Sequence, residues 1–403
     1  MTYSETLDWM FAQLPMYQKQ GKTAYHGKLD KILQFSEHLK YPERKFKSIH
    51  VGGTNGKGSS SHMLASILQE AGYKVGLYTS PHLKDFRERI RINGKPTSQN
   101  FVVNFIKNNS AFLEANKLSF FEMTVGMAFD YFAKEKVDIA IVEVGLGGRL
   151  DSTNIITPEV SLITNIGLDH TDMLGDTLGE IANEKAGIVK KGVPVVISEY
   201  QEEIAEVFQN MAISQKAALV FASNCALPKY NTDLLGNYQH KNIKGVLTVL
   251  KKLKGFTITE NHIKHGLLKV TQNTGLLGRW QILGGQPMIV CDTAHNKEGL
   301  SLVLDQIAQE EFNVLHIVLG FVKNKNLDLV LPLFPKKAHY YFCKPDIQRG
   351  LDADCLKKES MKYGLNGTLY PSVAEALNDA KSKASSKDFI FIGGSNFVVA
   401  EVV

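Results

Sequence analysis

The chain has 403 residues, of which 44% are hydrophobic and 22% charged, and its formal net charge is +5. This length and composition predict a globular protein of one large or two ordinary domains. The mild positive charge suits small anionic ligands, and the scattered lysines form no concentrated basic stripe, so a nucleic-acid partner is not expected.

The sequence gives no indication of export or of a membrane partner. The first residues lack the basic-then-apolar pattern of a signal peptide, and no apolar run approaches the roughly 18 residues that span a bilayer. No pair of cysteines has the spacing of a metal site, and the four are Cys225, Cys291, Cys343 and Cys355. We therefore expect a cytoplasmic protein with reduced thiols.

Short apolar runs alternate with helical patterns in the first part of the chain, which is typical of a parallel α/β sheet. The runs are nearly continuous, as in strands that are buried on both faces. The predicted strands are Lys47–Val51, Lys74–Thr79, Asp138–Val144, Val160–Ile166 and Val193–Ser198. Apolar residues at helical spacing after Lys57 predict a helix that ends at Gly72.

A second α/β series follows in the last third of the chain. Its predicted strands are Met288–Thr293, Val314–Gly320, His339–Cys343 and Phe389–Gly393, and its predicted helices are Lys297–Ala308 and Val373–Ala384. The glycine-rich segment Gln272–Gln286 has little periodicity, so we place the domain junction there. A substrate cleft between two such domains is expected.

The stretch GGTNGKG at 52–58 joins the first predicted strand to the first predicted helix. It departs from the standard P-loop pattern G-x-x-x-x-G-K-[ST], because Val51 and Gly58 stand at the first glycine and at the Ser/Thr position. Glycines let the backbone approach phosphates, the helix start supplies N–H donors, and Lys57 adds positive charge. Phosphate binding is therefore predicted, against the alternative of a glycine-rich turn with a solvent-exposed lysine.

Three polar residues stand in or after predicted strands, whose carboxyl ends face the ligand crevice of a parallel sheet. Ser80 follows the second strand, Glu143 lies within the third, and His170 follows the fourth. A buried carboxylate is costly unless it is paired or near a metal, so Glu143 and Ser80 suit Mg²⁺. The structural alternatives are a capping serine, a glutamate paired with a core lysine, and a packed histidine. Lys185, by its spacing alone, is interpreted as a surface lysine.

In the C-terminal half, Asp292 and His295 end the first strand of the second series, and Arg279 lies at the junction. These positions face a predicted cleft. A hydrolase pair is the alternative for Asp292 and His295, but no serine or cysteine elbow accompanies them.

Together these segments resemble the folylpolyglutamate synthase/dihydrofolate synthase group of the Mur ligase family. The motifs that carry the resemblance are GTNGKGS (53–59), SPHL (80–83), EVGLGGRLDSTN (143–154), LDH (168–170), EKAGI (184–188), NYQHKN (237–242), GR (278–279) and DTAHN (292–296). They occur in family order across nearly the whole chain, and the form GGRLD is similar to that of the bacterial members, which are often bifunctional. The resemblance implies a P-loop, Mur-ligase-type central parallel-sheet domain over 1–278. A smaller Rossmann-like α/β glutamate-ligase domain would follow over 279–403.

The implied activity is that of an ATP-dependent ligase. The carboxylate of dihydropteroate and/or (tetrahydro)folate would attack the γ-phosphate of ATP, and L-glutamate would then attack the acyl phosphate. The products would be dihydrofolate and/or folylpolyglutamates. The expected partners are these small molecules alone, and the resemblance implies a monomer.

The resemblance also implies roles for individual residues. Those expected to contact ATP are Thr54, Asn55, Gly56, Lys57, Gly58, Ser59, Asn242, Arg279, Asp292 and His295. Ser80 and Glu143 would bind one Mg²⁺ and His170 a second. Lys57, His170 and Lys185 would be catalytic, with Lys185 matching a family lysine that is carbamoylated and helps to fix the second metal. That assignment replaces the surface interpretation of Lys185.

The pterin-side pocket is matched by Ser119, Phe121, Glu122, Leu150, Asp151 and Ser152. The Phe121 ring can stack on a flat pterin, and Asp151 can accept its N–H groups. The chain departs from the family at Asn324-Lys-Asn326, where an Asp-Lys-Asp is common near the expected glutamate side. The segment Tyr25–Leu29 aligns loosely with a pteroate-binding loop.

The sequence leaves two alternative functions. One is a Mur-type ligase that joins an amino acid to a cell-wall nucleotide precursor, which the SPH and GGRLDSTN segments argue against. The other is a nucleotide-gated binding module without turnover, which the set of Glu143, His170 and Lys185 argues against.

Overall fold

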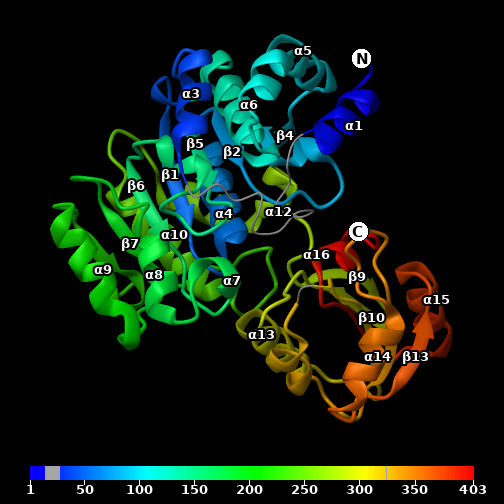
Figure 1. Cartoon of the computed structure of the whole chain (residues 1–403). Coiled ribbons are helices and arrows are strands. Elements are labelled where there is room, and N and C mark those ends of the chain that lie inside the picture. Colours follow the sequence, from blue (N-terminus) through cyan, green and yellow to red (C-terminus); the bar gives the residue numbers. More distant parts are fainter. Residues whose placement is uncertain (14–27, 324) are drawn as a thin grey trace. The chain divides into compact units, whose positions relative to one another are not determined.

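The computed structural model describes residues 1–13, 28–323 and 325–403, which form two compact units (Figure 1). The first comprises Met1–Asp233 and His240–Gly275, and the second comprises Leu234–Gln239 and Leu276–Val403. A single boundary after residue 278 was predicted, but Leu234–Gln239 also belongs to the second unit. Most of the segment Tyr25–Leu29, and Asn324, lie outside the described residues.

The first unit is built on an eight-stranded sheet in the order β4-β3-β2-β5-β1-β6-β7-β8. Its strands are β1 (Lys47–Gly52), β2 (Val75–Tyr78), β3 (Ile90–Ile92), β4 (Lys95–Pro96), β5 (Ile139–Glu143), β6 (Val160–Ile163), β7 (Val195–Ile197) and β8 (Leu219–Phe221). All neighbours are parallel except β2–β3 and β3–β4. The predicted parallel α/β sheet is confirmed, with β3, β4 and β8 as strands that were not predicted.

Strand β1 lies in the middle of this sheet, between β5 and β6. Val51 stands opposite Glu143, and Gly52 stands opposite Ile163. Each of these three strands is buried along its length, apart from the first residue of β1, which explains their continuous apolar sequences. Because parallel strands end at the same edge, the loops that follow β2, β5, β1 and β6 adjoin there.

The helices of the first unit cover this sheet. They are α1 (Tyr3–Gln13), α3 (Asp30–His38), α4 (Lys57–Glu70), α5 (Gln99–Ala115), α6 (Phe120–Lys134), α7 (Thr171–Leu174), α8 (Leu178–Ala186), α9 (Glu202–Ser214), α10 (Gln239–Lys252), α11 (Glu260–Leu268) and α12 (Val270–Thr274). Short 3₁₀ turns occur at Pro42–Arg44, Phe86–Arg89, Ser152–Ile155 and Ala222–Asn224. Helix α4 is buried from Ser59 to Leu68, and Ser66 donates a hydrogen bond to the carbonyl of Gly266 on α11 at 2.6 Å.

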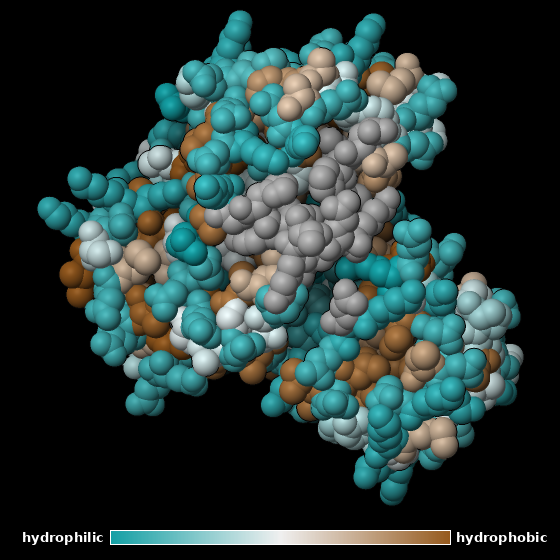
Figure 2. All heavy atoms as spheres, viewed as in Figure 1, coloured by the Kyte–Doolittle hydropathy of each residue, from teal (hydrophilic) through white to brown (hydrophobic). Residues whose placement is uncertain are grey.

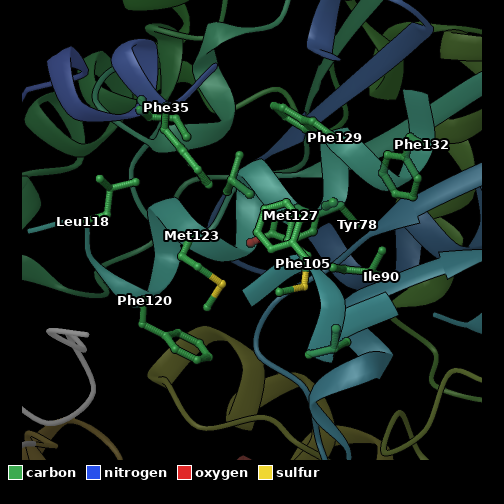
Figure 3. Close-up of a cluster of buried hydrophobic side chains, with 14 of the residues drawn as sticks. Phe35, Tyr78, Ile90, Phe105, Leu118, Phe120, Met123, Met127, Phe129 and Phe132 are labelled. Carbon is green, nitrogen blue, oxygen red and sulfur yellow. The ribbon is translucent and has the colours of Figure 1, made fainter. Parts of the chain in front are cut away.

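An aromatic-rich core packs helices α3, α5 and α6 against the sheet (Figure 3). Its buried members include Phe35, Tyr78, Phe105, Phe120, Met123, Met127, Phe129 and Phe132. Phe129 and Phe132 stand three residues apart on α6 and therefore project from the same face of the helix. Large aromatic side chains dominate the energetics of such cores, so this cluster fixes α6, whose first turn carries three of the predicted pterin-side residues.

The second unit has a six-stranded sheet in the order β13-β12-β11-β14-β10-β9. Its strands are β9 (Gln281–Gly285), β10 (Met288–Cys291), β11 (Leu315–Leu319), β12 (His339–Cys343), β13 (Gly367–Tyr370) and β14 (Phe389–Gly393). Its helices are α13 (Lys297–Ile307), α14 (Ala353–Met361), α15 (Val373–Lys383) and α16 (Asn396–Ala400), with 3₁₀ turns at Leu327–Leu329 and Leu331–Leu333. Only β9 is antiparallel to its neighbour. The predicted second α/β domain is confirmed, and β9 occupies part of the segment that was predicted only as a junction.

Hydrophilic residues cover most of the face in view in Figure 2. Large exposed hydrophobic side chains, such as Ile213 on α9, are scattered. Among the described residues, no helix is both long enough and apolar enough to cross a membrane.

Candidate active site

The loop Gly53–Gly56 joins β1 to α4 in the manner of a phosphate-binding loop. Gly56 is the N-cap of α4 and has a φ of 82°, in the left-handed region. A Cβ atom there would lie 2.2 Å from Oδ1 of Asn242, so the position requires glycine. The same contact shows that Asn242, on α10, lies against this loop. Lys57 begins the helix, where the first backbone N–H groups lack helical partners and can bind an anion.

The loop after β6 supports the phosphate-binding loop from the side. The backbone N–H of Asn55 donates to Oδ1 of Asn165 at 2.9 Å, and the hydroxyl of Thr164 donates to the carbonyl of Asn55 at 2.5 Å. The backbone N–H of Gly167 donates to the hydroxyl of Thr54 at 3.0 Å. These supporting residues were not among the predicted site residues, although their position directly after a predicted strand could have indicated them.

Glu143 and Ser80 meet at the carboxyl edge of the sheet. Glu143 is the last residue of β5 and is 5% exposed, and its Oε2 accepts a hydrogen bond from the backbone N–H of Ser80 at 3.0 Å. A carboxylate and a hydroxyl are oxygen donors of the kind that Mg²⁺ prefers, and this metal takes one or two carboxylates together with substrate phosphates. These two residues therefore fit a Mg²⁺ ion. Within the part of the chain that the structure describes, no three His, Cys, Asp or Glu side chains gather as a metal site.

Lys185 is buried beside the phosphate-binding loop. It lies in the last turn of α8, is 5% exposed, and its Nζ donates to the carbonyl of Gly53 at 2.9 Å. The Nζ of Lys57 donates to the same carbonyl and to that of Thr54, both at 3.0 Å. Burial, followed by the nearby charge of Lys57, lowers the pKa of Lys185 to about 7. The interpretation of Lys185 as a surface lysine, made from its spacing, is wrong.

His170 lies on the loop that leads from β6 into α7. It is the N-cap of α7, is exposed, and has a left-handed backbone with a φ of 52°. Non-glycine residues in this conformation are uncommon and cluster at functional sites. Its role as a metal ligand stays a prediction.

Ser119 and Glu122 form a buried capping box at the start of α6. The backbone N–H and the hydroxyl of Ser119 donate to Oε2 of Glu122 at 2.7 and 2.8 Å, and the N–H of Glu122 donates back to the hydroxyl. This pairing fixes the first turn of the helix and thereby the intervening Phe121. A Cβ atom at Gly145 would lie 2.3 Å from Cζ of Phe121, so this ring covers the turn that follows β5. The pterin-side roles of the three residues stay predictions.

The carboxylate of Asp151 accepts hydrogen bonds from residues of the turn in which it lies. It accepts hydrogen bonds from the backbone N–H groups of Gly145, Leu146 and Thr153 at 3.0, 2.9 and 2.9 Å, and another from the Thr153 hydroxyl. These four donors match the acceptor capacity of a carboxylate. Burial nevertheless raises its pKa. Asp151 therefore shapes the turn, with Leu150 half-buried and Ser152 buried beside it, and direct contact of these residues with pterin stays a prediction.

In the second unit, Asp292 organises the turn that follows β10. Its Oδ2 accepts from the backbone N–H of Trp280 at 2.7 Å and from the hydroxyl of Tyr238 at 2.6 Å, and its Oδ1 accepts from the N–H of Ala294 at 2.8 Å. Burial raises the pKa of this carboxyl group. Tyr238 was missed by sequence analysis, because it lies far from Asp292 in the chain.

Arg279 and His295 lie beside this turn. The guanidinium of Arg279 donates to the hydroxyl of Thr293, and the ring Nδ1 of His295 lies 2.9 Å from the carbonyl of Thr293. The structure thus brings Arg279, Asp292 and His295 together within the second unit. Their contact with ATP stays a prediction.

Comparisons with known proteins decide the family. The Mur ligase middle domain matches residues 51–268, and the Mur ligase, glutamate ligase domain matches 278–396. The chain is 32% identical to the dihydrofolate synthase/folylpolyglutamate synthase of Bacillus subtilis, over 99% of this chain and 98% of that protein. The chain belongs to the folylpolyglutamate synthase/dihydrofolate synthase group of the Mur ligase family.

Solved structures agree with this membership. A structure of E. coli FolC in complex with DHPP and ADP has a TM-score of 0.87 and 27% identity, covering 100% of this chain and 97% of that chain. A bifunctional folylpolyglutamate synthase/dihydrofolate synthase with Mn, AMPPNP and L-glutamate bound has a TM-score of 0.85 and 28% identity, over 100% and 97%. The chain spans only about half the length of another relative, a probable bifunctional folylpolyglutamate synthase/dihydropteroate synthase of Haloferax volcanii, which is 32% identical and of which 50% is covered.

The predictions of the family, of the two-domain α/β fold and of an ATP-dependent ligase that adds glutamate to folates are therefore confirmed. The relatives' complexes contain nucleotides and manganese ions.

Proposed function

We propose that this chain adds L-glutamate to dihydropteroate and/or to (tetrahydro)folate, using ATP, through an acyl-phosphate intermediate. The observation that carries the proposal is the buried amine of Lys185, which lies 2.9 Å from a carbonyl of the phosphate-binding loop. Glu143 ends a neighbouring strand at the same edge of the sheet. Family membership and the full-length relative from Bacillus subtilis support the same reaction.

Two bonds change in the first step. A carboxylate oxygen of the folate or pteroate forms a bond to the γ-phosphorus, while the bond between this phosphorus and the bridging oxygen breaks and ADP leaves. Such transfers depend on positioning and on charge stabilisation. The N–H groups at the start of α4 and the ammonium of Lys57 bind the phosphates. Ser80 and Glu143 would hold one Mg²⁺, and His170 would hold a second. When bound, these ions neutralise the charge that develops on the phosphoryl oxygens.

In the second step the nitrogen of L-glutamate forms a bond to the acyl carbon, and the bond from this carbon to the phosphate oxygen breaks. Phosphate leaves, and the attacking nitrogen loses a proton. Water must be excluded, because it would hydrolyse the intermediate. Phe121, Leu150 and Ser152 line the pterin side, and Arg279, Asp292 and His295 contact ATP.

The pKa of Lys185, about 7, supports the carbamate assignment. Near neutral pH a large share of this amine is uncharged, and only an uncharged amine can attack CO₂. Carbamoylation would replace a positive charge beside Lys57 with a negative one, which suits a metal-binding role. The cytoplasmic location and the monomeric state stay predictions.

The test is release of phosphate from ATP by the full chain. Release should require both L-glutamate and either dihydropteroate or tetrahydrofolate, and mass spectrometry should find each acceptor heavier by one glutamate residue. D-glutamate serves as the matched control for the amine. Absence of release with both acceptors would refute the proposed function, and the comparison of the two products decides between one synthase activity and two.

A further inference from the structure

The segment Gly148–Asn154 caps the C-terminal end of α8. The last carbonyl groups of a helix lack partners within it, and here two donors come from this segment. The backbone N–H of Arg149 donates to the carbonyl of Glu184 at 2.7 Å, and the side-chain Nδ2 of Asn154 donates to the carbonyl of Gly187, the C-cap residue, at 3.0 Å. The turn that follows β5 is therefore hydrogen-bonded to the end of α8, the helix that carries Lys185.

Asn154 is the centre of this connection. It is 6% exposed, and its Nδ2 also donates to the carbonyl of Arg149 at 3.0 Å. Its own carbonyl accepts from Nζ of Lys190 at 2.7 Å. One side chain thus bridges two backbone carbonyls, one on the turn and one at the end of α8. The NH₂ group of the amide supplies both donors from one nitrogen, which a carboxylate of the same size cannot do.

Close packing and an ion pair add to the connection. The guanidinium of Arg149 pairs with Oε1 of Glu184 at 2.7 Å. A Cβ atom at Gly187 would lie 2.4 Å from Cα of Arg149, which is too close for any other residue. The turn and the end of α8 consequently contact each other through backbone atoms, which have less freedom than long side chains.

We propose that Asn154 is a positioning residue that holds the acceptor-side turn, Gly145–Asn154, in register with Lys185. This inference rests on the proposed function, since it assigns the turn to the acceptor and Lys185 to the phosphate. Hydrogen bonds to Asp151 fix the conformation of the turn, and the hydrogen bond from Asn154 to Gly187 fixes the position of the turn relative to α8. The acceptor carboxylate and the γ-phosphate are then presented to each other by one connected piece of backbone, and small displacements in such an arrangement reduce the rate strongly.

The substitution Asn154→Asp tests this role. It keeps the size of the side chain, removes both donated hydrogen bonds and places an oxygen against two carbonyls. We expect kcat to fall on the order of 10- to 100-fold, as two lost hydrogen bonds would give. The KM for dihydropteroate or tetrahydrofolate should rise several-fold, while the KM for ATP should remain near its wild-type value. A general loss of folded protein would lower kcat without changing either KM.

Two matched variants accompany it. Arg149→Ala removes the ion pair with Glu184 but keeps the backbone hydrogen bonds, so it should change kcat and the acceptor KM in the same direction but by less. The double substitution Arg149→Glu with Glu184→Arg exchanges the two charges and should bring kcat and the acceptor KM closer to their wild-type values. Glu260→Gln removes an exposed ion pair with Lys264 on α11 and should leave all parameters unchanged. Where Asn154→Asp does not fold, Arg149→Ala still tests whether the connection between this turn and α8 sets the KM for the acceptor.

A second readout needs no turnover. Competitive amine labelling with mass spectrometry, in CO₂-depleted buffer without ATP, should show faster labelling of Lys185 in Asn154→Asp than in the wild type, with Lys264 unchanged. An unchanged acceptor KM, or unchanged labelling of Lys185 in a folded variant, would overturn the proposal. Failure of the wild-type chain to form product would instead refute the proposed function, and labelling would still report whether Asn154 positions Lys185.

Discussion

Each unit has a turn that a buried aspartate organises directly after a strand, but the two turns differ in what they are attached to. In the first unit, Asp151 accepts from Thr153, whose hydroxyl oxygen lies 2.9 Å from Nε2 of the buried His50 on β1. In the second unit, Asp292 accepts from Trp280 and from Tyr238.

The first turn is hydrogen-bonded to His50 and to the end of α8, and both of these elements carry a group that can change its protonation state. His50 lies on the strand that leads into the phosphate-binding loop, and α8, which Asn154 contacts, carries Lys185. Burial lowers the pKa of both residues. Asp292 instead joins the second turn to Trp280 and Tyr238. The difference indicates that one buried aspartate holds a local turn together, whereas the other belongs to a turn that also contacts β1 and the helix that carries Lys185.

The largest expected effect comes from Lys185→Ala, which should lower activity without unfolding the protein. Lys185→Ala should lower kcat on the order of 10²- to 10³-fold, the effect of removing one key group that stabilises charge in the transition state. The fold should be kept, because the loop around it is held by other residues. Phosphate release and circular dichroism check this, with Lys264→Ala as the exposed control, and short carboxylic acids should partly restore activity. Wild-type activity in the variant would remove the carbamate role.

The second prediction concerns the turn in the second unit. Asp292→Asn should destabilise this unit by about 2–3 kcal/mol, since an NH₂ group would then face donors that now bond to a carboxylate. Urea unfolding followed by the fluorescence of Trp280, in a Trp9→Phe background, measures the change locally. Asp305→Asn, on the exposed side of α13, is the control. Unchanged stability together with a raised KM for ATP would assign Asp292 to ligand binding instead.

The smallest expected effect concerns the pH dependence of the free energy of unfolding, to which His50, beside the first turn, should contribute. Burial, with the charge of Lys190 as the smaller cause, lowers the pKa of His50 to about 3. The unfolded chain therefore binds the proton first, so the stability from neutral His50 is complete above its ordinary pKa of about 6.5 and is lost as pH falls toward 3. Between pH 7 and 5 the loss amounts to about 2 kcal/mol. His50→Gln should remove this part of the pH dependence in urea titrations, and an unchanged pH profile would contradict it.

The parts of the fold that could be predicted from sequence are those with a strong local signal. Strands such as β5 are buried throughout and read as continuous apolar runs. Strands β3, β4, β8, β9 and β13 were not predicted, because they are short or only partly buried, and their pairing depends on neighbours distant in sequence.

The residues of the candidate site also divide into those with a local sequence signal and those without one. The order of glycine, Lys57 and helix predicted a strand, loop and helix, which β1, Gly53–Gly56 and α4 form, and phosphate binding by this loop stays a prediction. The burial of Lys185 could not be derived from its spacing, because α8 packs its last turn under the loop Gly53–Gly56 only in three dimensions. Tyr238 and Asn165 act through hydrogen bonds to partners far along the chain, and such pairings leave no periodic signal.

The passage of Leu234–Gln239 into the second unit has a consequence for dissecting the molecule. A fragment starting at Leu276 would contain the whole six-stranded sheet but would lack Tyr238, a donor to Asp292. It would also strip the buried amide of Gln306 of its partners at Leu235 and Asn237. The second unit is thus a discontinuous domain. A truncation that follows the linear boundary would lose these contacts, and a fragment that keeps Leu234–Gln239 joined to its N-terminus would retain them.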